Sequence, residues 1–203
     1  MALKLEKGSI GTSDVVIIGG GMTGLILAAA LGTAGLVVSV IEQSSRERLL
    51  KSTFDGRTTA IAAGSRNALS VIGAWERMEE NASDILDIRI SDGLSPLFLH
   101  FGHADLDEGP LGHIVENRII RSALLGRLDE LPTVKLIFGC CVKTLERGEH
   151  FAEARLDNGK TLKASIAVAA DGRGSPTREA AEIGVKQWRY PQIGIVCTVK
   201  HER

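Results

Sequence analysis

The sequence predicts an α/β protein in which a parallel βαβ core carries an added antiparallel layer. Two observations lead to this prediction. An apolar run that ends in glycines is followed by a Leu- and Ala-rich segment and a second β-branched run, all between residues 14 and 43. Several short strand-like segments, separated by turn signals, then fill the later part of the chain.

The βαβ core is predicted from three consecutive segments. Val15–Ile18 is apolar at every position, as expected for a central parallel strand covered on both faces. Leu25–Thr33 is rich in leucine and alanine, which are strong helix formers, and Gly35 is a suitable residue to end that helix. Val37–Ile41 is a second β-branched strand, and Glu42 follows it. The whole arrangement fits the length of a βαβ unit, about 30 residues.

The turn between the first strand and the helix has the pattern Gly-x-Gly-x-x-Gly over residues 19–24. In a Rossmann-type unit the first glycine permits the tight turn and the second lets a pyrophosphate approach the backbone. The third glycine allows the helix to pack closely on the strand. Gly19, Gly21 and Gly24 fill these positions. Because the helix N-terminus also offers free N–H groups to phosphates, we expect a dinucleotide here.

Glu42 indicates which dinucleotides are favoured at this turn. A carboxylate at the end of the second strand accepts hydrogen bonds from both ribose hydroxyls and repels a 2′-phosphate, so NADP is disfavoured at this site. NAD and FAD both fit the βαβ core. An NAD-dependent dehydrogenase would normally continue with alternating β–α units, whereas a polar stretch, a long helix and a meander follow here. That order of elements favours FAD.

The later elements are predicted from periodicity and turn signals. Asp157-Asn158-Gly159-Lys160 is a strong hairpin signal between two of the strands. The expected elements are a polar loop or irregular helix over 44–56, a helix over 60–77, strand structure over 85–101, a helix over 117–128, and strands over 134–138, 141–145, 152–156, 161–164, 166–170 and 193–199.

Composition places the chain among soluble globular proteins. Its 203 residues carry a net charge of −1, so no overall field attracts nucleic acid. The apolar runs are far too short to span a bilayer, and the N-terminal segment lacks the apolar core of a signal peptide. We therefore expect a cytoplasmic protein, with peripheral membrane contact left open.

Neither a disulfide framework nor a metal site is predicted. Cys140, Cys141 and Cys197 do not form a C-x-x-C pattern, and we expect all three to be small buried apolar residues. His100 and His103 invite a metal interpretation, but on a strand their spacing would place them on opposite faces, and nothing orients them.

Four segments of the chain carry motifs of a known family: Asp14–Gln43, Asp55–Ser65 (DGRTTAIAAGS), Leu111–Ile120 (LGHIVENRII) and Ala170–Arg178 (ADGRGSPTR). They resemble the group A flavoprotein monooxygenases, which have the p-hydroxybenzoate hydroxylase fold. The first is common to many FAD proteins. The second is more particular to the branch of ubiquinone-biosynthesis hydroxylases that act on polyprenylated phenols, and this branch is the most similar. Together the four segments span nearly the whole chain.

The resemblance implies a set of residues at the FAD cofactor. They are Gly19, Gly21, Met22, Thr23, Gly24, Glu42, Gln43, Arg57, Asn117, Val142, Asp171 and Gly172. Glu42 would bind the adenosine ribose, Val142 would contact adenine through its backbone, and Arg178 would brace the Asp171-Gly172 motif. Simpler interpretations remain open: Arg57 as a solvated loop charge, Asn117 as a helix N-cap and Asp171-Gly172 as an ordinary turn.

The resemblance also implies an activity and a domain organisation. Residues 1–203 would be the FAD-binding domain of a longer enzyme, truncated before a later GDAAH-type motif, with 83–112 and 186–203 contributing to a substrate-domain sheet. The enzyme would hydroxylate a polyprenylated phenol with NAD(P)H and O₂, and no acid–base catalyst is identified within the chain. An FAD-dependent reductase, an NAD-dependent dehydrogenase and a non-catalytic fragment are the alternatives. The oligomeric state is not predicted.

Overall fold

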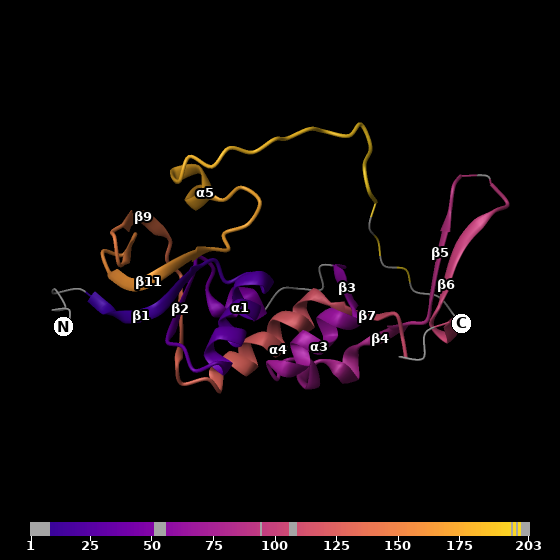
Figure 1. Ribbon diagram of the computed structural model, residues 1–203, viewed down its shortest axis with the longest axis horizontal. Coiled ribbons are helices and arrows are strands. Elements are labelled where there is room, and N and C mark those ends of the chain that lie inside the picture. The colour runs from indigo at the N-terminus through magenta and orange to yellow at the C-terminus, as the bar shows by residue number, and fades with distance from the viewer. Residues whose placement is uncertain are drawn as a thin grey trace. The chain divides into compact units, whose positions relative to one another are not determined.

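A computed structural model describes residues 9–50, 56–93, 95–105, 109–195, 197 and 199 (Figure 1). The chain divides into two compact units. The first comprises residues 1–52 and 124–195, and the second comprises residues 53–123 and 196–203.

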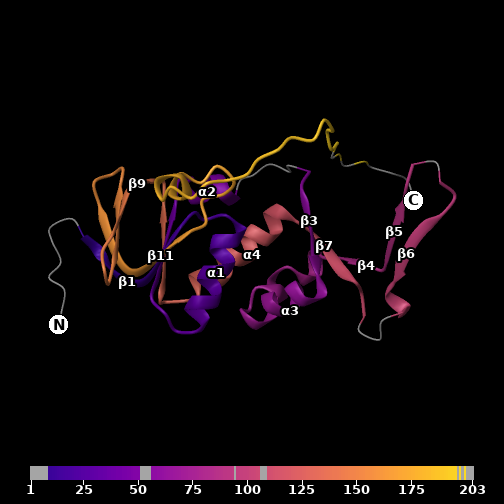
Figure 2. The ribbon, with the colours of Figure 1, turned by 45° about the horizontal axis from the view of Figure 1, so that its top comes forward.

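The βαβ core of the first unit forms as predicted. Strand β1 (Ser9–Ile18) leads into helix α1 (Met22–Thr33), and strand β2 (Val38–Glu42) pairs with β1 in parallel, with Val15 opposite Val38. Helix α1 runs alongside these strands (Figure 2). The apolar run at the end of β1 is buried throughout, because the sheet is covered on both faces.

The first unit is built on a six-stranded sheet with the order β8-β2-β1-β11-β10-β9. Its added strands are β8 (Val134–Phe138), β9 (Val142–Arg147), β10 (Ala152–Leu156) and β11 (Thr161–Ala169). Strands β8, β2, β1 and β11 are parallel, whereas β11, β10 and β9 form the antiparallel meander. The two strands predicted over 161–164 and 166–170 are therefore one, because β1 pairs with both halves of β11.

Strand β11 has one free edge. Its first half, up to Ala164, lies between β1 and β10, but β10 pairs no further along it. From Ile166 to Ala169 the only strand paired with β11 among the described residues is β1. Ile166 is 58% exposed, although it lies within a parallel strand. An unpaired strand edge of this kind offers N–H and C=O groups to a further strand.

The second unit contains a three-stranded antiparallel sheet that the sequence did not predict. Its order is β3-β7-β4, formed by β3 (Thr58–Ala62), β7 (Gly112–Glu116) and β4 (Ser83–Ile85). The helix predicted over 60–77 is wrong at both ends: α3 spans only Ala63–Val71, and a 3₁₀ turn covers Trp75–Arg77. The cause is tertiary, since pairing with β7 overrides the helical spacing of the first residues.

The remaining elements are one long helix and several short segments. Helix α4 (Asn117–Asp129) confirms the helix predicted over 117–128, and α2 (Arg46–Leu50) is a brief helix in the polar stretch. The strand structure expected over 85–101 is a hairpin of β5 (Asp87–Ser91) and β6 (Phe98–Gly102). Two further 3₁₀ turns cover Glu79–Asn81 and His103–Asp105, and a short helix, α5, covers Pro176–Ala180.

The strand predicted over 193–199 is not formed at its described positions. Ile193 and Ile195 are 91% and 88% exposed, and no strand pairs with them within the described ranges. An apolar β-branched run becomes a strand only when a neighbour satisfies its backbone groups. The contribution of 83–112 and 186–203 to a substrate-domain sheet stays a prediction. In the part of the chain that the structure describes, no helix has the length and apolar character needed to cross a membrane.

Candidate functional site

The glycine turn between β1 and α1 has little room at Gly19, Gly20 and Gly24 and free space at Gly21. A Cβ atom on Gly19, whose φ is +112°, would lie 2.3 Å from the Ala170 carbonyl oxygen. A Cβ atom on Gly24 would lie 2.0 Å from the Gly19 carbonyl oxygen. Around Gly21, by contrast, nothing described lies within 4 Å of a built Cβ. Gly19 and Gly24 are thus required for packing, while Gly21 leaves space for a ligand.

The carboxylate of Glu42 lies directly beside this turn. Its Oε2 atom accepts a hydrogen bond of 2.7 Å from the Gly20 N–H, and its Oε1 atom accepts one of 2.7 Å from the Ser44 N–H. Both oxygens are thereby oriented, and each keeps a lone pair for a further donor. The structure therefore brings Glu42 to the glycine turn, where a bound nucleotide would present its ribose.

The N-terminus of α1 is available to an anion. The helix begins at Met22 with Gly21 as its N-cap residue, and no side chain caps it. The first N–H groups of a helix have no partner within the helix, and the positive end of the dipole lies there. Met22 and Thr23 thus present backbone donors beside the free space at Gly21, an arrangement suited to a diphosphate.

A pocket of about 480 Å³ lies next to the turn. Its volume is within the range of ligand-binding clefts, about 300–1,000 Å³. The residues that line it come from the ends of β1, β2 and β11 and the loops after them, from the loop before β9 and the start of β9, and from the start of α5: Ile18, Gly19, Gly21, Ile41, Glu42, Gln43, Cys140, Cys141, Val142, Ala170, Asp171, Gly172, Gly174, Pro176 and Thr177. Seven predicted cofactor residues are thereby gathered around one cavity, at the carboxyl ends of parallel strands.

Asp171 stabilises the loop that follows β11. Its Oδ2 atom accepts a 3.0 Å hydrogen bond from the Thr177 N–H. Partial burial raises the pKa of Asp171, but hydrogen bonds from Ser175 and Thr177 outweigh this effect, and the pKa lies below its ordinary value. Arg178 braces the same loop, since its Nη2 donates to the Arg173 carbonyl oxygen at 2.9 Å.

We expect Asp171 to make unfolding stability pH-dependent. A carboxyl group whose pKa is lower in the folded state stabilises the fold above its unfolded pKa, about 3.9, and loses that contribution as the pH falls through the folded value. Urea unfolding of wild type and Asp171→Asn should therefore differ more at pH 7 than at pH 3. An equal difference at both pH values would contradict this role of the carboxylate.

Arg57 and Asn117 belong to the second unit, where the structure brings them together. The Asn117 N–H donates to the Arg57 carbonyl oxygen at 3.0 Å, and the Asn117 side-chain oxygen accepts a 2.6 Å hydrogen bond from the Thr59 hydroxyl. Asn117 is the first residue of α4, and the Arg57 side chain is exposed. Their contact with a cofactor stays a prediction. Asp55, the first residue of the same motif, lies outside the described residues.

The prediction that all three cysteines are buried is right for Cys140 only. Cys140 is 2% exposed, and burial raises the pKa of its thiol. Cys141 and Cys197 are exposed. The difference arises because β9 begins at Val142, so that Cys141 lies in the preceding loop and lines the pocket. In the sequence, the only sign that Cys141 lines the pocket was its position next to Val142, which was predicted to contact adenine.

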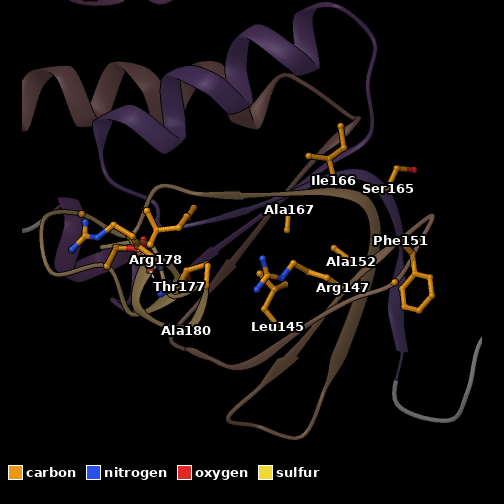
Figure 3. Close-up of a pocket in the computed structure, with 17 residues that line it drawn as sticks. Leu145, Arg147, Phe151, Ala152, Ser165, Ile166, Ala167, Thr177, Arg178 and Ala180 are labelled. Carbon is orange, nitrogen blue, oxygen red and sulfur yellow. Dashed lines mark hydrogen bonds between the residues drawn. The ribbon is translucent and has the colours of Figure 1, made fainter. Parts of the chain in front are cut away.

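A second cleft, of about 640 Å³, lies beside the free edge of β11. Its walls are the outer parts of β9, β10 and β11 and the helix α5, and Asp171 and Gly172 line both cavities. Figure 3 shows Arg178 and Thr177 toward one end of this cleft and Phe151 toward the other, with Ala167 between them. No pattern of residues predicted this cleft.

Comparison with known proteins identifies the family. The model of the FAD binding domain matches residues 12–199. The chain belongs to this FAD-binding family. The family's cofactor is FAD, as predicted from the meander after the βαβ core. The Rossmann-type fold class is confirmed as well.

Several curated proteins are similar to this FAD-binding chain. Ubiquinone hydroxylase UbiL of Rhodospirillum rubrum is 44% identical over 94% of this chain and 44% of its own length. Ubiquinone hydroxylase UbiM of Neisseria meningitidis is 32% identical over 93% of this chain and 42% of its own. The 3-demethoxyubiquinol 3-hydroxylase of Escherichia coli is 30% identical over 94% and 49%. The chain thus spans less than half the length of these relatives.

Solved structures share the fold. PqsL of Pseudomonas aeruginosa in complex with 2-aminobenzoylacetate has a TM-score of 0.74 and 25% identity, over 89% of this chain and 49% of its own. The flavin-dependent monooxygenase PieE, solved with FAD and substrate, has a TM-score of 0.72 and 17% identity, over 88% of this chain and 33% of its own.

Proposed function

We propose that this chain is the FAD-binding part of a monooxygenase that hydroxylates a polyprenylated phenol in ubiquinone biosynthesis, with NAD(P)H and O₂ as co-substrates. The proposal depends on one observation above all: the Glu42 carboxylate lies 2.7 Å from the Gly20 N–H, beside a turn with free space at Gly21. The relatives named as ubiquinone hydroxylases, at 44% and 32% identity, support the choice of substrate class.

The pyrophosphate, the ribose and the adenine of FAD each have a matching group in the first unit. The backbone amides of Gly21, Met22 and Thr23 would hold the pyrophosphate, and Glu42 would accept hydrogen bonds from the ribose. Gln43 and Val142 would border the adenine, because they line the same pocket.

The remaining predicted residues would contact the cofactor beyond its adenosine end. Asp171 and Gly172 would lie along the pyrophosphate side, and the resemblance assigns Arg57 and Asn117 to the same cofactor. When bound, FAD supplies the redox and oxygen chemistry, while the protein orients it and excludes water. The apolar polyprenyl tail of such a substrate would lie in a membrane, and the enzyme would bind the substrate at the membrane surface. We therefore expect a cytoplasmic enzyme that contacts the membrane peripherally.

We further propose that the protein is the N-terminal part of a longer enzyme, in which an extended segment pairs with the free edge of β11. The support is the pairing itself: β10 reaches only to Ala164, while the second cleft exposes Ile166 and Ala167 beside that edge. A parallel sheet is normally covered on its faces and continued at its edges by other strands.

Two proline substitutions test this free edge. The Ala170 N–H donates to Ile18 on β1, so by alternation the Val168 N–H also faces β1, while the Ala167 N–H faces the free edge. We expect Val168→Pro to lower the free energy of unfolding by about 1–3 kcal/mol, because it removes a ladder hydrogen bond and leaves the acceptor on β1 without its donor. We expect Ala167→Pro to cost about 1 kcal/mol or less in this chain, since proline is tolerated at such edge positions.

Urea unfolding of both variants gives the comparison. In a longer form that includes the region corresponding to the relatives' second half, Ala167→Pro should become as damaging as Val168→Pro. If Ala167→Pro lowers the free energy of unfolding by the same small amount in this chain and in the longer form, no further strand pairs with this edge.

The activity is tested with the same two lengths. FAD titration, followed by flavin fluorescence, measures cofactor uptake by each. With the longer form, a polyprenylated phenol should stimulate NAD(P)H oxidation, and a hydroxylated product should appear. If NAD(P)H is oxidised at a rate that the phenol does not change, and no hydroxylated product appears, the FAD-dependent reductase is favoured. Binding of NAD without flavin would favour a dehydrogenase, and binding of neither would favour a non-catalytic fragment.

A further inference from the structure

The loop before β9 forms one wall of the nucleotide pocket, and it is fixed from two sides. On the side of β2, the Cys140 N–H donates to the Glu42 carbonyl oxygen at 3.4 Å, and the Gly139 N–H donates to the Ser44 carbonyl oxygen at 3.3 Å. These bonds tie the loop to the strand end that carries the Glu42 carboxylate. The other side of the loop faces the turn between β10 and β11.

On that other side a single residue holds both backbone groups of Cys141. The Cys141 N–H donates to the Asp157 carboxylate oxygen Oδ1 at 3.2 Å, and the Asp157 N–H donates to the Cys141 carbonyl oxygen at 2.9 Å. Asp157 itself is not among the residues that line the pocket. It therefore acts on the pocket only through Cys141 and the adjacent Val142.

The reason for this side-chain contact is a break in the strand ladder. Strands β9 and β10 pair regularly as far as Thr144 opposite Arg155, and the register then shifts so that Val142 lies opposite Leu156. A bulge of this kind disrupts the ladder and re-aims the residues beside it. At the next position the Asp157 carboxylate, and not a backbone carbonyl, accepts the Cys141 N–H.

We propose that Asp157 is a positioning residue for the nucleotide pocket: its carboxylate fixes the wall formed by Cys141 and Val142, against which the adenosine end of the nucleotide binds. The inference rests on the proposed FAD site. It adds to that site a residue from a distant turn which contacts no ligand, and it explains why the Asp157–Lys160 turn matters beyond closing a hairpin.

The test compares three variants of the full chain, with ADP as the probe. Asp157→Ala removes the acceptor for the Cys141 N–H and should weaken ADP binding about threefold to tenfold, the range for one lost hydrogen bond. Asp157→Asn keeps a side-chain oxygen at the same place and should bind ADP nearly as wild type does. Asn158→Ala is the matched control, because it removes the 3.1 Å bond from the Lys160 N–H to the Asn158 oxygen in the same turn without touching Cys141. It should leave ADP binding unchanged.

The cysteines give a second readout that is independent of activity. Cys141 is exposed in the pocket, Cys197 is exposed and does not line it, and Cys140 is buried. Alkylation of each thiol by N-ethylmaleimide can be followed by mass spectrometry. ADP should protect Cys141 but not Cys197, and Asp157→Ala should increase the rate at Cys141 relative to Cys197 when no nucleotide is present.

The outcomes separate this inference from the proposed function. If wild type neither binds ADP nor shows protection of Cys141, the nucleotide site itself is wrong, and the inference is overturned with it. If wild type binds ADP and protects Cys141 while Asp157→Ala behaves identically, the site stands and Asp157 has no positioning role. If Asp157→Ala and Asn158→Ala weaken ADP binding equally, binding requires an intact turn and not the Asp157 carboxylate in particular. That result would also overturn the inference.

Discussion

Gly24→Ala is expected to destabilise the first unit and to abolish FAD binding. The new methyl carbon would lie 2.0 Å from the Gly19 carbonyl oxygen, far inside van der Waals contact, and that oxygen belongs to the backbone and has no rotamer to change. Either α1 moves away from β1 or the turn opens. We expect a loss of about 3 kcal/mol in the free energy of unfolding, at the upper end for overpacked sites. Urea unfolding and FAD titration measure the two effects.

Gly21→Ala is the matched control for this prediction. Gly21 has φ −71° and ψ 176°, which alanine adopts without strain, and nothing described lies within 4 Å of the built Cβ. Its stability should therefore stay within about 1 kcal/mol of wild type. FAD affinity should nevertheless fall about tenfold or more, because the methyl group occupies the space proposed for the pyrophosphate. Normal FAD binding by Gly21→Ala would show that the phosphates lie elsewhere.

Glu42→Ala is expected to weaken binding of the adenosine half by about a hundredfold or more. Two charge-assisted hydrogen bonds to ribose hydroxyls would be lost, each worth about 1.5–3 kcal/mol. The Gly20 and Ser44 N–H groups would also lose their acceptor, so that the turn becomes less ordered. Isothermal titration with ADP measures the affinity, and urea unfolding measures the cost to the fold.

Glu42→Gln separates charge from shape at the same position. Wild type should strongly prefer ADP to its 2′-phosphorylated analogue, because the Glu42 carboxylate repels the added phosphate. The neutral glutamine should reduce that preference while retaining an acceptor oxygen. If both proteins discriminate equally, Glu42 does not face the ribose and the proposed orientation of FAD is wrong.

The local sequence predicted the nucleotide-binding core well, because each of its elements follows from nearby residues. The apolar run Val15–Ile18 can be buried only as a central strand, and the spacing of Gly19, Gly21 and Gly24 reflects contacts within one turn. The distance from this turn to Glu42 is set by one helix and one strand. Short-range geometry therefore brought Glu42 to the Gly20 amide without help from the rest of the chain.

Elements that depend on distant partners were predicted less well. The segment over 58–62 has helical spacing in its continuation, yet pairing with Gly112–Glu116 makes it a strand. Ile193 and Ile195 look like part of a strand, yet no described neighbour pairs with them. Cys141 reads as a buried strand residue, and only the bulge opposite Arg155 places it in a pocket wall.

The sequence by itself determined the βαβ core, the glycine turn and the carboxylate that meets it, because these interactions span one turn, one helix or one strand. Only the tertiary structure decided which wall closes the pocket, how far β10 follows β11, and that Asp157 holds Cys141. Those contacts join residues far apart in the chain, and their pairing depends on register and bulges that no local pattern of residues encodes.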